Sequence, residues 1–215
     1  MAPSTDAFRQ ACEAEVLRLW GGEPDGAHDL GHLRRVWANC QTIAMDEPGA
    51  DLQVLLPAAI FHDAVNLPKT HPDRAQASQA SAKVAVDWLG TQNYPADKLD
   101  AVAHAIAAHS FSAGIEPTTV DARILQDADR LEALGALGIA RMFHVAGATG
   151  GLLFDADDPL ARHRPLNDRA FALDHLEVKL FRIVDTMKTA TGRRIAEERA
   201  EWMASFRSRL LREIG

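Results

Sequence analysis

The chain has 215 residues, enough for one large domain with a sizeable core, and 47% of them are hydrophobic and 25% charged, as in ordinary soluble proteins. Its net charge of −7 argues against a broad nucleic-acid-binding surface, because such a surface needs a basic face. A small phosphorylated ligand remains compatible with this charge, since a few local Lys and Arg side chains can oppose the global sign.

The cysteines and the apolar runs indicate the compartment. Cys12 and Cys40 both fall at apolar helical positions, which is typical of reduced core residues. The start "MAPSTDAF" has no basic segment and no apolar core of a signal peptide. The longest apolar runs, of about eight residues, are less than half of a membrane span. We therefore expect a cytoplasmic protein without a membrane partner.

Five helices are expected in the first half of the chain. Nearly every patterned segment repeats its apolar residues with the helical period, and none alternates as a half-buried strand does. Caps, glycines and prolines delimit a helix that starts near Thr5, one capped by Asp29, one over 51–63, one ending at Gly90 and one opened by Pro95. The third contains Pro57, so it is either kinked or begins later than its pattern suggests.

Three further helices and a long loop are expected in the second half. One helix begins near Thr119 and runs without interruption through "ILQDADRLEALGALGIA". Residues 146–168 are rich in Gly, Asp and Pro and predict a loop. Two final amphipathic helices are divided at Thr191-Gly192. The predicted class is all-α, in a single domain spanning 1–215.

Three clusters place polar residues where an apolar stripe should continue. "HDLGHLRRV" contains His32, "AAIFHDAV" contains the adjacent pair His62 and Asp63, and "QDADRLEALG" contains Asp127 and Asp129. Imidazole nitrogens and carboxylate oxygens are suitable ligands for a divalent metal ion. Ligands on three helices can close such a site in the core of a bundle.

Each cluster by itself also has a structural explanation. A single histidine on an apolar face is often only hydrogen-bonded in the core, and a His-Asp pair at a helix end can cap backbone groups. The two aspartates of the third cluster can pair with Arg130 at the surface. The combination favours a metal site, because burying an unpaired aspartate beside a histidine is costly and one cation would compensate all of these groups.

The order H…HD…D in an all-helical chain resembles the HD-domain phosphohydrolase superfamily. The segments "HDLGHLRRVW", "FHDAVNLPKTHPDRAQAS", "AHSFSAG", "LQDADRLEALGALGIARMF" and "KLFRIVDTMKTATGRRIAEERAEWMASF" resemble, in this order, the small bacterial HD proteins that include nucleotide pyrophosphohydrolases. The resemblance covers most of residues 25–210. It implies an HD-domain helical bundle with a core over 25–145 and a C-terminal pair of helices over 165–215.

The resemblance also implies a set of metal ligands. The first is His32 rather than His28, because it stands before "RRV", and His62 and Asp63 are the signature pair that also acts in catalysis. The last is Asp129, since the final aspartate of the superfamily commonly precedes a basic residue and Leu, as in "ADRL". A mixed His/carboxylate site suits Mn, Fe, Co, Ni or Zn better than Mg.

Helical geometry alone does not choose between the two aspartates of "QDADRL". Asp127 and Asp129 lie about equally far to either side of the apolar stripe of their helix. Asp127 therefore remains the reserve candidate for the fourth ligand.

One departure from the superfamily concerns the proton donor. Related enzymes often place a Glu shortly after the signature pair, whereas this chain has Asn66, and an amide cannot transfer a proton in that way. His109 and His71 are candidates for the general acid, although each can equally be a structural or surface histidine. The residues expected to hold the substrate are Asn66, Lys69, His109, Arg130 and Arg141.

These observations predict a metal-dependent phosphohydrolase whose substrate is a small phosphorylated molecule. The resemblance suggests cleavage of a nucleoside triphosphate to the monophosphate and pyrophosphate. The alternatives are a nucleotide- or metal-sensing HD module without turnover, a nucleoside monophosphate phosphatase, and a helical protein whose metal is only structural. The oligomeric state stays open.

Overall fold

The computed structural model describes residues 5–21, 29–67, 71 and 73–215, and their regular secondary structure is helical. The extended pairing within this part is an isolated bridge between Leu152 and Phe171. The all-α prediction is therefore confirmed. The chain divides into two compact units, Met1–Asp129 and Arg130–Gly215, which we describe separately. The single domain expected from the sequence, with its core and C-terminal extension, stays a prediction.

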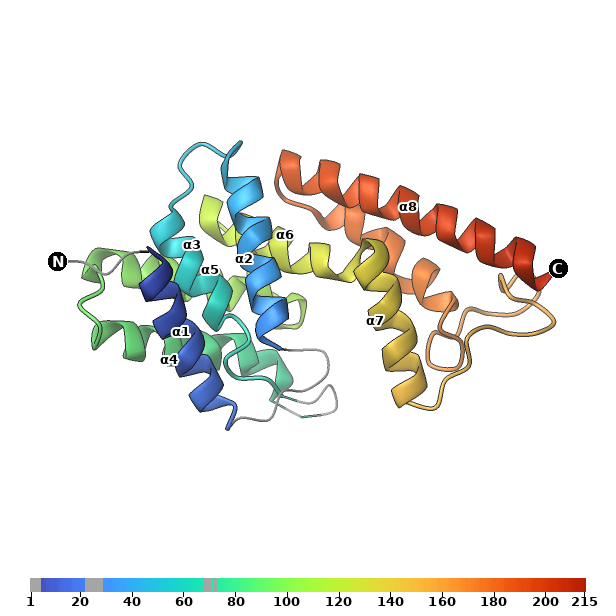
Figure 1. The fold of residues 1–215 in the computed structure, drawn as a ribbon, viewed down its shortest axis with the longest axis horizontal. Coiled ribbons are helices and arrows are strands. Elements are labelled where there is room, and N and C mark those ends of the chain that lie inside the picture. The colour runs from blue at the N-terminus through green and yellow to red at the C-terminus, as the bar shows by residue number, and fades with distance from the viewer. Residues whose placement is uncertain (1–4, 22–28, 68–70, 72) are drawn as a thin grey trace. The chain divides into compact units, whose positions relative to one another are not determined.

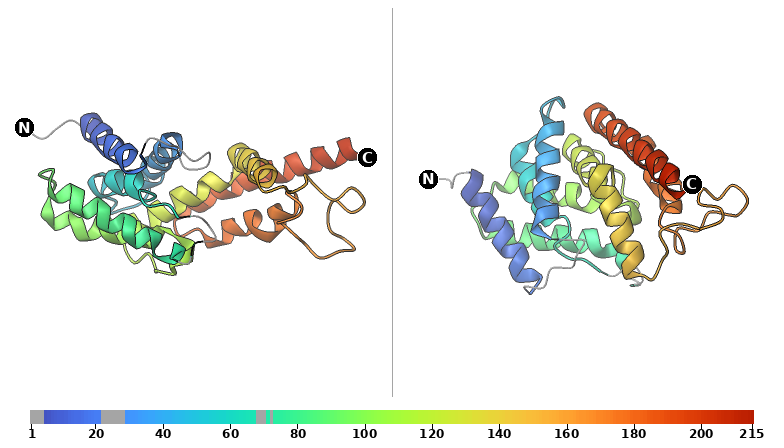
Figure 2. Two further views of the ribbon diagram at one scale, coloured as in Figure 1. Left: turned by 90° about the horizontal axis from the view of Figure 1, so that it is seen from below. Right: turned by 45° about the vertical axis from the view of Figure 1, so that its right-hand side comes forward.

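The first unit is a bundle around one apolar helix (Figure 1). Helix α3 is at its centre, and its residues from Val54 to Phe61 are buried. It packs against α1, α2, α4 and α5, of which α4 and α5 lie side by side (Figure 2, left). The helices of this unit are α1 (Thr5–Leu19), α2 (Leu30–Ala44), α3 (Leu52–Phe61), α4 (Ala77–Gly90), α5 (Leu99–His109) and α6 (Val120–Arg130), the last ending one residue past the unit boundary.

Asp51 sets where α3 begins, and Tyr94 explains how the helix tolerates its internal proline. The Asp51 side chain caps the helix by accepting from the Gln53 N–H at 2.8 Å, so α3 begins at Leu52 and the later start considered from the sequence is wrong. Pro57 has no N–H to donate to the carbonyl of Gln53, four residues earlier. The Tyr94 hydroxyl donates to that carbonyl instead, at 2.9 Å.

The uninterrupted helix expected after Thr119 is instead two helices. Helix α6 ends at Arg130, a 3₁₀ turn covers Leu131–Ala133, and α7 runs over Gly135–Ala148. Leu134 is extended and Gly135 has φ of 72°, a left-handed conformation that glycine adopts without strain. Because α7 continues to Ala148, the loop begins later than predicted.

The C-terminal helices are also divided at a different point. A π-helical turn (Leu176–Leu180) and a 3₁₀ segment (Phe181–Thr186) precede α8 (Ala190–Ile214). The Thr189 hydroxyl caps α8 by accepting from the Gly192 N–H at 3.0 Å. The predicted break at Thr191-Gly192 is therefore wrong, since these residues form the first turn of the helix. Among the described helices, none combines the length and the hydrophobicity needed to cross a membrane.

Candidate metal centre

Two histidines stand at helix C-termini of the first unit, where backbone carbonyls lack helical donors. His62 follows the last residue of α3, and its Nδ1 donates to the Ala59 carbonyl at 2.9 Å. His109 ends α5, and its Nδ1 donates to the Ile106 carbonyl at 2.6 Å. A carbonyl can only accept, so Nδ1 carries the proton in each ring. The neutral form of each imidazole then has its lone pair on Nε2.

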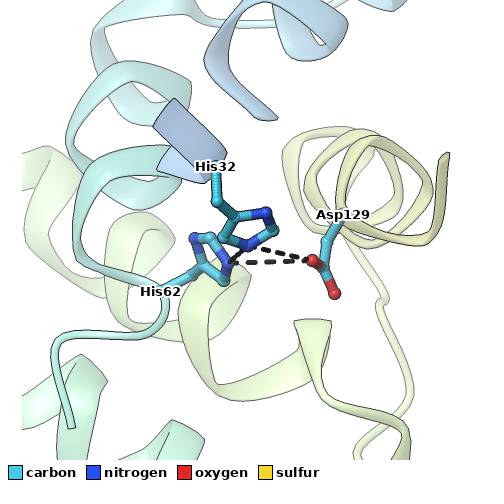
Figure 3. Close-up of side chains that lie close together, drawn as sticks. All are labelled: His32, His62 and Asp129. Carbon is cyan, nitrogen blue, oxygen red and sulfur yellow. Dashed lines mark hydrogen bonds and ion pairs between the residues drawn. The ribbon is translucent and has the colours of Figure 1, made fainter. Parts of the chain in front are cut away.

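A third histidine and two aspartates complete a cluster around the Nε2 atom of His62. His32, in the first turn of α2, has its Nε2 atom 3.2 Å from that of His62. Asp129 Oδ1 lies 3.5 Å from His32 Nε2 and 3.8 Å from His62 Nε2, and Figure 3 shows the three side chains pointing toward one another. Asp63 Oδ2 lies 3.5 Å from His62 Nε2 and 3.8 Å from His32 Nε2.

The donor set and its spacing fit a divalent ion. Two nitrogen ligands, each about 2.1 Å from a shared ion, lie about 3.0–3.4 Å from one another. The two Nε2 atoms of His32 and His62 have this separation. Carboxylate oxygens at slightly longer range would complete the set with small side-chain shifts. Mixed imidazole and carboxylate ligands suit the first-row transition metals and zinc.

The electrostatics of the cluster also favour a cation. His62 is fully buried, and this burial lowers the pKa of its imidazole to about 4, so the ring is neutral and able to ligate near pH 7. The carboxylates remain partly open to solvent, with 22% of the Asp63 side chain and 31% of the Asp129 side chain exposed. The C-terminal ends of α3, α5 and α6, which carry partial negative charge, all supply residues to the cluster.

The structure separates the two aspartates that helical geometry left equivalent. Asp129 lies in the cluster, whereas Asp127 is fully buried and belongs to neither of the His/Asp groups found among the described residues. Asn39 on α2 donates through Nδ2 to the carbonyl of Ala128 at 3.1 Å, and this bond ties α6 to α2 directly before Asp129.

His109 extends the cluster on the other side of Asp63. His109 Nε2 lies 3.7 Å from Asp63 Oδ1, and the rings of His109 and His62 meet edge to face with 4.8 Å between centroids. Burial opposes a proton on His109, but the Asp63 carboxylate outweighs it, so the pKa of His109 is raised. The group of His62, Asp63 and His109 shares His62 Nε2 with the first group, since His62 Nδ1 is held by Ala59. The two groups therefore form one centre.

Comparisons with known proteins identify the family of the chain. A family model described as HD domain matches residues 29–134. The uncharacterized protein YpgQ of Bacillus subtilis is 32% identical over 215 residues, which is 96% of this chain and 96% of YpgQ. The chain belongs to the HD-domain superfamily.

Solved HD structures extend the match to the whole fold. An HD-superfamily hydrolase from Bacillus thuringiensis superposes with a TM-score of 0.75 at 28% identity, covering 97% of each chain. A structure of Bacillus subtilis YpgQ in complex with ADP superposes with a TM-score of 0.72 at 32% identity, covering 96% of this chain and 97% of that one. The HD-domain bundle expected from the sequence is confirmed, and the chain is a YpgQ-like HD-superfamily hydrolase.

A small polar cavity adjoins the HD pair. Its volume is about 20 Å³, room for about one water molecule. It is lined by Asp63, Val65, Asn66, Arg74, Ala77, Ser78, His109, Ser110 and Ser112. From the sequence, Arg74 is one of the basic residues available to hold phosphates, although its default interpretation is a solvated surface residue, and the sequence did not single out the three serines. The serines at 110 and 112 follow His109 directly in "HSFS", so this tetrapeptide was the available signal.

Hydrogen bonds to helix-end carbonyls hold the residues of the HD site in place. Gln126 Nε2 donates to the Ala108 carbonyl at 2.8 Å, next to His109. Ser78 Oγ donates to the Ala107 carbonyl at 3.0 Å. Trp20 Nε1 donates to the carbonyl of Asp63 itself at 3.3 Å. These donors come from three other helices or their ends, so no local sequence pattern could have indicated them.

The remaining predicted residues lie elsewhere. Lys69 is outside the described residues, and Arg141 is half-buried on α7 of the second unit. Arg130 Nη1 donates to the Thr186 carbonyl at 2.7 Å within the second unit. His71 is 40% exposed, and its Nδ1 accepts from the Asp73 N–H at 3.1 Å, as a residue that shapes a turn does. The roles of these residues in binding substrate or donating a proton stay predictions.

Proposed function

We propose that this chain is a metal-dependent phosphohydrolase that acts on nucleotides and cleaves nucleoside triphosphates to monophosphate and pyrophosphate. The observation that carries the proposal is the meeting of His32 Nε2, His62 Nε2 and Asp129 Oδ1, from three helices, within 3.8 Å of one another. The nucleotide class is supported by the YpgQ relative, which was crystallised with ADP.

His32, His62, Asp63 and Asp129 would hold the ion. An ion bound there would lower the pKa of a water molecule, which could then act as the nucleophile, and would polarise a phosphoryl oxygen. Asp63 has a second task, because its Oδ2 faces the histidines of the cluster while its Oδ1 faces His109. One carboxylate thus links the metal ligands to the cavity.

The cavity residues can bind the phosphate and carry a proton. Arg74 lines the cavity, and its Nη1 donates to the Leu67 carbonyl, so its positive charge is held in a fixed position near the cavity. His109 lines the same cavity, and because its Nδ1 is bonded to the Ile106 carbonyl, its Nε2 can hold a proton for a leaving oxygen. Asn66 lines the cavity too and can orient substrate through its amide.

The amide at Asn66 bears on which bond is cleaved. Pyrophosphate is a stable anion that leaves without a strong acid, whereas an alkoxide released from a monophosphate needs one. We therefore expect triphosphates to be cleaved between the α- and β-phosphates, far better than monophosphates are dephosphorylated.

The test is phosphorus NMR of the products formed from nucleoside tri- and monophosphates with Mn, Co, Ni, Zn and Mg in turn, each repeated with a chelator. Monophosphate and pyrophosphate, formed only with metal, are the expected products. Free phosphate from monophosphates at comparable efficiency would make the chain a monophosphate phosphatase. Tight nucleotide binding without any product would make it a sensing module.

A further inference from the structure

The apolar side chain of Phe111 is exposed to solvent next to residues that line the cavity. It is 84% exposed, and it begins the short 3₁₀ turn Phe111–Ala113 that follows α5. Large apolar side chains are normally covered by the fold, and an aromatic ring presented to solvent at a polar site is typical of a binding surface. The exposed ring is therefore available to contact a ligand at this site.

The position of the ring relative to the candidate centre is fixed by the chain. Phe111 stands between Ser110 and Ser112, both of which line the cavity together with Asp63 and His109. Consecutive Cα atoms are about 3.8 Å apart, so Phe111 is at the rim of this cavity. The turn is held by a contact of 3.0 Å between the two serine hydroxyls and closed by Gly114, whose φ is 64°.

Size decides which part of a nucleotide can lie there. The cavity of about 20 Å³ holds a water molecule or a phosphoryl oxygen, and it is too small for a purine or pyrimidine. A nucleotide with its phosphates at the centre must therefore leave its base outside the cavity. Met45, another strongly exposed apolar side chain among the described residues of the first unit, follows the C-terminal end of α2, whereas His32 lies in the first turn of that helix.

We propose that Phe111 is the surface on which the nucleobase of the substrate stacks. This inference rests on the proposed nucleotide phosphohydrolase function and adds to it a rule for specificity. Every base has a π-face, so stacking on one ring rewards the presence of a base without distinguishing which base it is. Polyphosphates that lack a base gain nothing from the ring.

The experiment compares nucleotide and base-free ligands on the same variants. Binding of ADP and of inorganic pyrophosphate, each with Mn²⁺, is measured by calorimetry for the wild type, Phe111→Ala, Phe111→Trp and the matched control Met45→Ala. We expect Phe111→Ala to weaken ADP binding about five- to 150-fold, the range that corresponds to ~1–3 kcal/mol for one stacked base, and to leave pyrophosphate binding unchanged. Phe111→Trp should restore ADP binding, and Met45→Ala should have no effect.

Four results would overturn the proposal, and they can be told apart. Equal weakening of ADP and pyrophosphate would show that the turn shapes the cavity and that the ring does not bind the base. Unchanged ADP binding with an altered sedimentation coefficient would identify a second copy of the chain as the partner of Phe111. If the wild type binds pyrophosphate or ADP and Phe111→Ala has no effect on binding, only the stacking proposal is refuted. If the wild type binds neither ligand, the proposed function is refuted as well.

Discussion

The substitutions Asp129→Asn and Asp127→Asn should have opposite effects on metal binding and on stability. Both replace a carboxyl group with an amide of nearly the same shape, at positions two residues apart on α6. Asp129 is 31% exposed on its side chain and lies 3.5 Å from His32 Nε2, so its loss should leave the free energy of unfolding within ~0.5 kcal/mol. Metal affinity should fall more than about 100-fold, because mutating even the residues that only hydrogen-bond to metal ligands lowers affinity by about 10- to 100-fold.

Asp127 should show the reverse pattern because it is fully buried. Changing a buried, interacting polar group costs about 1–3 kcal/mol of stability, while the metal ligands remain in place. Elemental analysis of the purified variants and urea unfolding without metal measure the two effects separately. Full metal occupancy in Asp129→Asn, or loss of metal in a folded Asp127→Asn, would refute the assignment of the fourth ligand.

Three further substitutions test a buried hydrogen bond and two ion pairs that we expect to stabilise the two units. Gln126→Leu removes a buried donor to a carbonyl of α5 and should cost about 1–3 kcal/mol in urea unfolding while metal occupancy stays unchanged. Glu13→Gln should destabilise the protein near neutrality, because the hydrogen bond from Arg34 holds the pKa of the Glu13 carboxyl below 4.5. That stabilisation is present above pH 4.5 and is lost as pH falls through the lowered value, so the melting temperatures of variant and wild type should converge in acid. Asp174→Asn should lower the melting temperature, since Asp174 is 2% exposed and accepts from Arg164 at 2.6 Å, and an unchanged melting temperature would contradict this.

The sequence predicted the fold class and most helices of the first unit because periodicity and caps are local signals. Asp29 illustrates this, since its side chain does accept from the His32 N–H, at 2.7 Å. The break between α6 and α7 was missed because it is decided by packing. "EALGALGIA" continues the helical period, and nothing in it shows that Gly135 takes a positive φ or that a side chain at Gly138 would clash with the Ala133 carbonyl oxygen.

The candidate site could be predicted to the same extent. The positions of His62 and His109 on apolar helical faces were visible in the sequence, and the structure places their rings against each other. The choice between Asp127 and Asp129 was not available from α6 alone, because a helix turns about 100° per residue and the two flank its apolar stripe symmetrically. That choice depends on how α6 is rotated against α2, to which the Asn39 bond ties it.

The way in which the histidines are fixed bears on whether the metal is catalytic or only structural. The Nδ1 atoms of His62 and His109 are bonded to carbonyls of their own helices, so their tautomers are set before any ion binds. The helices that supply the ligands are held together independently of the ligands, by packing against the buried residues of α3 and by hydrogen bonds from the side-chain amides of Asn39 and Gln126. Because these helices are already held together without an ion, a purely structural metal is not needed here. A preformed donor set beside a cavity of polar residues instead matches what metal-assisted hydrolysis requires, namely ligands held in place and room for the reacting oxygen.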